Sequence, residues 1–253
     1  MPQNVKEKFR RIEPILVKPL MVIMSVRRIP VVLEAFGKLN FIDKVYFRNY
    51  TPAAISDVIN DYLKVHFKPY THIILMPDDI TPTPLNIQRL IDDVRYYDFP
   101  VVGGYCNICK FSRFDADHCV ICEFCQDNVA HILTNITFEP VDHKHLLSKA
   151  SYQNLTLAYA SSLSDIYPVW FHGMACGVIN KETYKQIPLR SWWSGEKGLM
   201  QDLAYAVDCE KLGIQQFVDF RVAMRHYGTH HGRLLVGNEP TSIEFVEARS
   251  VEL

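Results

Sequence analysis

Short apolar runs alternate with longer amphipathic stretches along the first part of the chain. Four apolar runs predict strands, at residues 20–26, 43–48, 73–76 and 99–102. Nearly continuous apolar character is typical of strands that are buried on both faces. Between these runs, apolar residues recur at helical spacing, which predicts helices at residues 30–39, at 53–67 and from Pro84 onward. This alternation of strands and helices predicts an α/β sheet with crossover helices.

The third apolar run leads directly into two adjacent carboxylates, in the stretch THIILMPDDITPTP. Asp78 and Asp79 follow the strand, Thr83 suits a helix N-cap, and Pro84 suits the first helical position. Ligands of such sheets bind beyond the carboxyl ends of the strands. Because carboxylate oxygens are suitable ligands for Mg²⁺ or Mn²⁺, the two acids predict a metal site for a phosphate-bearing ligand. The alternative is an Asp-Asp turn that only connects a strand to a helix.

The second half of the chain has a less regular pattern. Strands are predicted at residues 169–179 and 217–224. A helix is predicted at residues 199–212, and Gly213 suits its C-terminal cap. The tail from Asn238 is acidic and weakly patterned, so no element is predicted there.

Composition narrows the function classes. The 253 residues with a 48% hydrophobic share predict one domain with an ordinary core. The formal net charge of -1 argues against a nucleic-acid partner and against an anionic membrane surface. No apolar run approaches the roughly 20 residues that cross a bilayer, and the run that ends at Met24 is too short for a signal-peptide core. We therefore expect a cytoplasmic protein without a transmembrane segment.

Five of the seven cysteines crowd into one short segment. The pairs Cys106-x-x-Cys109 and Cys119-x-x-Cys122 can supply four thiolates to a structural zinc ion. Nine residues separate the two pairs, fewer than in the usual zinc ribbon. With Cys125, the second pair also has the spacing of ferredoxin-type iron–sulfur ligands. The third alternative is a set of reduced, partly buried cysteines without a metal.

The order of these features resembles glycosyltransferases of the GT-A fold, a family-2-like class that uses nucleotide sugars. MPDDI resembles the acidic metal motif of the family, and FPVVGGYCN resembles the strand and turn that usually come next. WFHGMACGVINKETYKQI resembles the acceptor-side strand, glycine pair and helix. MQDLAYAVDCEKLGIQQFVDFRVAMRHYG resembles the late block, in which an acid opens a helix and a histidine follows a strand. The resemblance spans roughly residues 18–230, apart from the cysteine segment.

The resemblance implies a Rossmann-like mixed sheet flanked by helices, with a Cys-rich insertion. It divides a single domain, residues 1–253, into four parts. A nucleotide-binding half covers residues 18–104, and the insertion covers 105–150. An acceptor-side half covers residues 151–235, and a tail follows at 236–253.

The resemblance also implies roles for individual residues. Asp79 matches the last acid of the metal motif, which holds Mn²⁺ or Mg²⁺ against the diphosphate of the donor. Asp78 matches the middle acid, which faces the ribose or the metal, whereas Pro77 replaces the first acid. Asp202 matches the general base of inverting members. His226 matches a late histidine that completes the metal shell in some members.

Further residues are assigned to the donor and the acceptor. Val26 and Arg27, at the end of the first strand, match the nucleotide-binding start of the family. Trp192 and Trp193 lie in the loop SWWSGEKG and are predicted to stack on a sugar or acceptor. The alternative for these tryptophans is that they anchor the loop to the core. Gly173 matches the acceptor-side glycine.

These assignments predict a hexosyltransferase-like enzyme that moves a sugar from a UDP- or GDP-sugar to a glycan, lipid or protein acceptor. A divalent cation neutralises the departing diphosphate, and a carboxylate takes the proton of the acceptor hydroxyl. One base serves an inverting displacement, and no second catalytic group is identified for a retaining route. A nucleotidyltransferase is an alternative, but SVRRIPVV lacks the glycine-rich phosphate loop of that class. A zinc-stabilised binding module without enzymatic activity is the other alternative.

Overall fold

The computed structural model describes most of the chain outside the cysteine segment. The described residues are 9–25, 30–48, 50, 54–108, 129–130, 155, 157–174, 176–194, 197–199, 201–230, 233–239 and 242–247. The predicted insertion at residues 105–150 therefore lies largely outside the described residues. No helix in the described ranges is long and apolar enough to cross a membrane.

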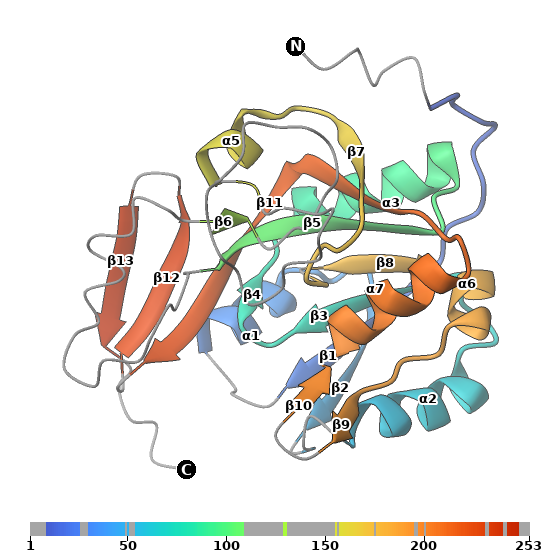
Figure 1. Cartoon of the computed structure of the whole chain (residues 1–253), viewed down its shortest axis with the longest axis horizontal. Helices are drawn as coiled ribbons and strands as arrows, with labels where there is room; N and C mark the ends of the chain where they lie inside the picture. The colour runs from blue at the N-terminus through green and yellow to red at the C-terminus, as the bar shows by residue number, and fades with distance from the viewer. Residues whose placement is uncertain are drawn as a thin grey trace.

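A single mixed sheet forms the centre of the structure (Figure 1). Its main strands lie in the order β13-β12-β11-β5-β8-β3-β1-β2. They span Ser242–Glu247 (β13), Arg233–Glu239 (β12), Gln216–His230 (β11), Val101–Ile108 (β5), Gly177–Asn180 (β8), His72–Pro77 (β3), Pro19–Ser25 (β1) and Asp43–Arg48 (β2). β1 pairs in parallel with β2 and β3, and β11 pairs in parallel with β5. β8 runs antiparallel between β3 and β5, so the sheet is mixed.

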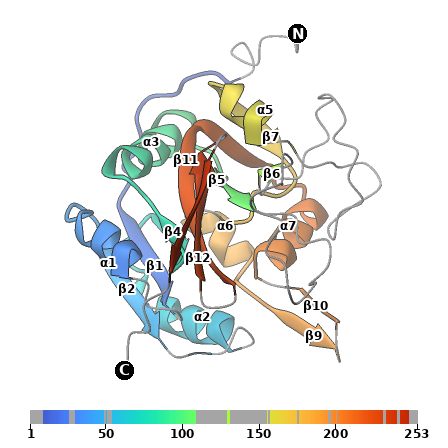
Figure 2. The same ribbon diagram turned by 90° about the vertical axis from the view of Figure 1, so that its left-hand side faces the viewer.

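Alternating side chains of the central strands fill two separate cores, one on each face of the sheet. On one face, Met21 and Ile23 of β1 pack with α1 (Pro30–Gly37) and α3 (Pro84–Tyr97). On the other face, Leu20 and Val22 pack with α2 (Ile55–His66), α6 (Lys181–Gln186) and α7 (Gln201–Lys211). Figure 2 shows α1 and α3 on one side of the strands and α6 and α7 on the other. The predicted mixed sheet flanked by helices is confirmed, and this architecture is consistent with a GT-A or Rossmann-like fold.

The β3–α3 connection forms as its residues predict. Thr83 caps α3, because its hydroxyl accepts a hydrogen bond from the Asn86 backbone N–H at 3.1 Å, and Pro84 occupies the first helical position. The helix ends at Asp98, which has a left-handed conformation with φ of 49°. A two-residue strand between β3 and α3, β4 (Ile80–Thr81), was not predicted.

One strand prediction was wrong. Residues 169–179 were expected to form one strand, but β7 (Ile166–Val169) and β8 are separated by a turn. Within this turn, Gly173, Met174 and Cys176 have φ values of 61°, 45° and 70°. Left-handed backbone ends extended structure, so the apolar run is divided between two strands that pair with different neighbours.

The C-terminal part of the sheet extends further than its sequence pattern indicates. β11 pairs with β5 through a register shift between Val218 and Ala223, then continues to pair with β12 and β4. β12 reaches into the weakly patterned tail that begins at Asn238, β13 lies within that tail, and both strands extend the sheet at one edge (Figure 1). The remaining short elements are β6 (Val129–Ala130), α5 (Leu157–Ser162), and the hairpin of β9 (Trp192–Ser194) and β10 (Lys197–Leu199).

Candidate functional site

A cavity of about 220 Å³ lies beyond the carboxyl ends of β1 and β3. Met24 and Pro77, the last paired residues of these two parallel strands, line it. Five predicted site residues line the same cavity: Asp79, Cys106, Gly173, Asp202 and His226. Strand ends of this kind are where open α/β sheets bind ligands, so the topology and the lining residues both make this cavity the candidate active site.

Asp79 and His226 form a close pair across one wall of the cavity. The Nε2 atom of His226 lies 3.2 Å from Oδ2 of Asp79, although the two residues are 147 positions apart in sequence. The contact depends on β4, because Ile80 pairs with His226 and Thr81 with Arg225 in an antiparallel ladder with β11. Asp79 is 7% exposed, so its carboxylate sits in a wall from which most water is excluded.

The Asp79–His226 pair is a suitable partial ligand set for a divalent cation. Carboxylate oxygen suits Mg²⁺ and Mn²⁺, and imidazole nitrogen is accepted by Mn²⁺ more readily than by Mg²⁺. Within the part of the chain that the structure describes, no group of three His, Cys, Asp or Glu side chains forms a metal-binding cluster. Two protein ligands nevertheless match sites in which substrate phosphates and water complete the coordination. Asp78 is 3% exposed beside this pair and does not line the cavity.

Asp202 enters the cavity from the first turn of α7, which begins at Gln201. Burial raises the pKa of its carboxyl group, and hydrogen bonds from backbone N–H groups oppose the rise. One of these bonds is short, from Leu203 N–H to Oδ1 of Asp202 at 2.7 Å. The positive end of the helix dipole also favours the ionised carboxylate. A rise in the pKa of a carboxyl group makes its carboxylate form a stronger general base.

The turn after β7 forms another wall of the cavity through Gly173 and Met174. Met174 and Cys176 hold left-handed backbone conformations that side chains disfavour, and Met174 is 5% exposed. Strained backbone of this kind persists only where the surroundings enforce it, and it is concentrated at functional sites.

The ring of His172, a residue of this turn, lies against Gly103 of β5 and Gly177 of β8. A Cβ atom on Gly103 would lie 2.7 Å from the ring of His172, and one on Gly177 would lie 3.0 Å from it. The ring therefore occupies space that only glycines at these two positions leave open. Sequence reasoning noted the glycines but missed His172 and Met174, although both lie within the quoted WFHGMACG motif.

Cys106 is the one member of the predicted zinc set that the structure describes at side-chain level. It is 1% exposed and lines the cavity, and burial together with the nearby Asp202 raises the pKa of its thiol to about 12. A thiol with this pKa is protonated at neutral pH in the absence of a metal. Cys109, Cys119 and Cys122 lie outside the described residues, so the zinc site stays a prediction.

Four other predicted ligand contacts also stay untested. Val26 and Arg27 lie outside the described residues. The backbone of Trp192 and Trp193 forms β9, in which Trp192 pairs with Leu199 and Trp193 with Gly198. The structure describes the backbone alone for these two tryptophans, so their stacking role remains a prediction.

Comparisons with known proteins concern the fold. No protein-family profile matches the chain, and no curated protein sequence matches it significantly. The crystal structure of A197 from STIV superposes with a TM-score of 0.53 at 12% identity, over 92% of this chain and 95% of that chain. This likeness covers nearly the whole of both chains and shows a shared fold.

Two further solved structures have lower scores. GalNAc-T7 with UDP, GalNAc and Mn²⁺ superposes with a TM-score of 0.47 at 9% identity, over 83% of this chain and 44% of that chain. CMP:2-keto-3-deoxy-manno-octonic acid synthetase complexed with CTP gives a TM-score of 0.36 at 15% identity, over 79% and 88% of the two chains. The chain is therefore similar in fold to A197 across a mixed α/β domain.

Proposed function

We propose that this protein is a glycosyltransferase that moves a sugar from a UDP- or GDP-sugar to an acceptor hydroxyl, with Mn²⁺ or Mg²⁺ and with inversion at the anomeric carbon. One observation carries the proposal: the Asp79–His226 pair and the carboxylate of Asp202 line a single cavity at the carboxyl ends of parallel strands. A metal-ligand pair and a separate, partly buried base in one cavity meet the two requirements of transfer from a diphosphate donor.

In this proposal Asp79 and His226 hold the cation that meets the donor diphosphate. When bound, the divalent cation neutralises the charge that develops on the departing diphosphate. Their positions on different elements, joined through the β4–β11 ladder, keep the two ligands 3.2 Å apart before any substrate arrives. Preorganised ligands reduce the cost of assembling the site at the moment of reaction.

Asp202 acts as the general base in the proposed reaction. Its carboxylate accepts the proton of the acceptor hydroxyl while the acceptor oxygen forms a bond to the anomeric carbon. The bond from that carbon to the diphosphate oxygen breaks, and its electron pair leaves with the nucleoside diphosphate.

The strained turn gives the acceptor side its shape. Gly173 and Met174 line the cavity wall, and the ring of His172 fills the space beside Gly103 of β5. This arrangement leaves room for an acceptor next to Asp202.

Product analysis tests this function without knowledge of the acceptor. The protein is incubated with a panel of UDP- and GDP-sugars and Mn²⁺, and released nucleotides are resolved by chromatography. We expect slow release of UDP or GDP by transfer to water, and a loss of roughly a hundredfold or more in Asp202→Asn, as is typical for removal of a general base. Asp57→Asn is the matched control, because Asp57 is an exposed first-turn acid of α2.

A parallel incubation with nucleoside triphosphates and sugar phosphates separates the rival functions. Release of a nucleoside diphosphate supports sugar transfer. Formation of pyrophosphate from a nucleoside triphosphate and a sugar phosphate identifies a nucleotidyltransferase and contradicts the proposal. Unchanged release in Asp202→Asn removes Asp202 from the role of base.

A further inference from the structure

A second and larger cavity, of about 590 Å³, lies between α2 and α6. It is near Phe67 and Lys181, close to the residues where β3 begins and β8 ends, whereas the candidate active site lies at the other end of β3. The six residues of β3 separate the two ends by roughly 17 Å. The proposed transferase reaction makes no use of this cavity, which we call the lysine pocket.

The floor of the lysine pocket is aromatic and apolar. Phe67 and Tyr184 meet edge to face with ring centroids 5.6 Å apart, and Leu63 and Pro188 complete the apolar lining. The hydroxyl of Tyr184 donates to Oδ1 of Asn60 at 2.7 Å, so the ring is held in one orientation. A volume of this size and an apolar floor match sites for small organic ligands.

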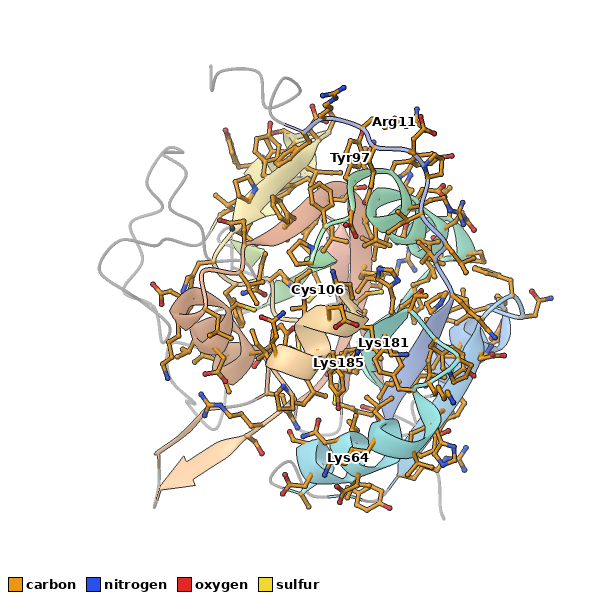
Figure 3. The ribbon with its side chains drawn as sticks, turned by 90° about the vertical axis from the view of Figure 1, so that its right-hand side faces the viewer. Arg11, Lys64, Tyr97, Cys106, Lys181 and Lys185 are labelled. Atoms are coloured by element: carbon orange, nitrogen blue, oxygen red, sulfur yellow. The ribbon has the colours of Figure 1, made fainter. Side chains whose placement is uncertain are left out.

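Four lysines line the same cavity: Lys64, Lys68, Lys181 and Lys185. Figure 3 shows Lys64 on α2 and Lys181 and Lys185 on α6, at one face of the molecule. Lys64 pairs with Asp61 and Lys185 pairs with Glu182, and all four of these side chains are more than half exposed. Exposed ion pairs contribute little to stability, so a bound anion can replace them at little cost.

Lys181 offsets the partial negative charge at the C-terminal end of α2, which would be unfavourable for a bound anion. The C-terminus of a helix carries partial negative charge, which would repel an anion. The Nζ atom of Lys181 donates to the carbonyl oxygens of Phe67, Lys68 and Tyr70 at 3.1, 2.9 and 3.0 Å. Among the described residues no carboxylate pairs with Lys181 or Lys68. The four lysines that line this cavity are therefore paired with two carboxylates, those of Asp61 and Glu182.

We propose that the lysine pocket binds an organic phosphate, with the phosphate among Lys64, Lys68 and Lys185 and the apolar part against the aromatic floor. Lysine ammonium groups bind phosphate as point charges. Several such groups together suit a ligand with two negative charges better than they suit a single carboxylate. A free metabolite and a lipid headgroup both present this chemistry. We assign the pocket to recognition, because the described residues that line it include no carboxylate, histidine or cysteine.

Calorimetry with phenyl phosphate tests the pocket on the full chain. The titration is made at low salt with a chelator present, so that metal-dependent binding at the candidate active site is suppressed. We expect one phenyl phosphate per chain, weaker binding of phenol and of inorganic phosphate, and a loss of roughly tenfold in the double variant Lys68→Gln, Lys185→Gln. Lys38→Gln is the matched control, because Lys38 forms a similar exposed pair with Glu34 on α1.

Three results would overturn the proposal: no heat of binding, equal binding in the double variant and the wild type, or an equal loss in Lys38→Gln. A sedimentation assay with phosphatidic acid vesicles identifies the source of the phosphate. Vesicle retention that the double variant loses supports a lipid ligand, whereas phenyl phosphate binding without retention supports a free metabolite. The variant Asp79→Asn should bind phenyl phosphate normally, so failure here is distinguishable from failure of the proposed transferase function.

Discussion

The buried carboxylates Asp93 and Asp219 predict an unusual pH dependence of stability. Asp93 on α3 and Asp219 on β11 have side chains that are 5% and 0% exposed, and Arg221 bridges them. Two hydrogen bonds of 2.8 Å join Arg221 to Asp219, and a longer contact of 3.3 Å joins it to Asp93. Burial and the neighbouring Asp219 raise the pKa of Asp93 from 3.8 to about 8, with a small further rise from Asp92 and an opposing effect from Arg221.

The sign of the effect follows from proton binding. The folded state holds a proton on Asp93 that the unfolded state releases near its ordinary pKa of 3.8. This stabilisation is therefore complete below the unfolded pKa and is lost as the pH rises through the folded pKa of about 8. A single such group changes the free energy of unfolding by at most about 1.4 kcal/mol per pH unit, or about 4 kcal/mol between about pH 5 and about pH 8.

Asp93→Asn removes this titration while it keeps the shape of a neutral carboxyl group. We expect the variant and the wild type to differ least in stability below the ordinary aspartate pKa of 3.8, and the variant to become progressively more stable than the wild type towards about pH 8. Urea unfolding followed by circular dichroism measures both curves. Asp92→Asn is the control, because Asp92 is an adjacent, 41% exposed acid that pairs with Arg95. Parallel pH profiles for Asp93→Asn and the wild type would refute the reasoning.

Three further predictions concern the cavity, the sheet and the lysine pocket. Because the pKa of Asp202 is raised, lowering the pH should reduce the transfer rate at pH values that are still above the ordinary aspartate pKa. A pH–rate profile in which the rate falls only at the ordinary aspartate pKa would contradict this role. Gly104→Ala should destabilise the protein by about 1–3 kcal/mol in urea unfolding, since the new Cβ would lie 2.6 Å from the Val222 carbonyl oxygen. Gly37→Ala should cause no such loss, because a Cβ at that position would have nothing within 4 Å. Tyr184→Phe loses the 2.7 Å bond to Asn60 and should cost about 0.5–1.5 kcal/mol in the same assay; an unchanged midpoint would contradict that estimate.

The elements that the sequence predicts well are those whose residues specify them locally. β2 has the predicted bounds, and the Thr83 cap and Pro84 start of α3 are confirmed, because side-chain and backbone preferences act within a few residues. The turn that interrupts residues 169–179 was missed. Its left-handed residues Met174 and Cys176 are not types that favour this conformation, so the surrounding structure determines it.

The arrangement of the candidate site could be predicted only in part. The order of motifs that resembles the GT-A family pointed to Asp79, Asp202 and His226, and the structure brings all three to one cavity. Their separation could not be predicted, because it depends on the two-residue strand β4 and on the register shift in β11. Pairing between strands so distant in sequence depends on the whole sheet rather than on local pattern. The roles of these residues stay predictions.

Calorimetry with UDP and GDP tests the central claim, that Asp79 and His226 hold a metal against a nucleoside diphosphate. We predict that one of the two nucleotides binds the wild-type protein in the presence of Mn²⁺, that a chelator abolishes the binding, and that Asp79→Asn and His226→Ala weaken it by roughly tenfold or more. Asp57→Asn should bind as the wild type does. Failure of both nucleotides to bind with Mn²⁺, or equal binding by Asp79→Asn and the wild type, would contradict the account.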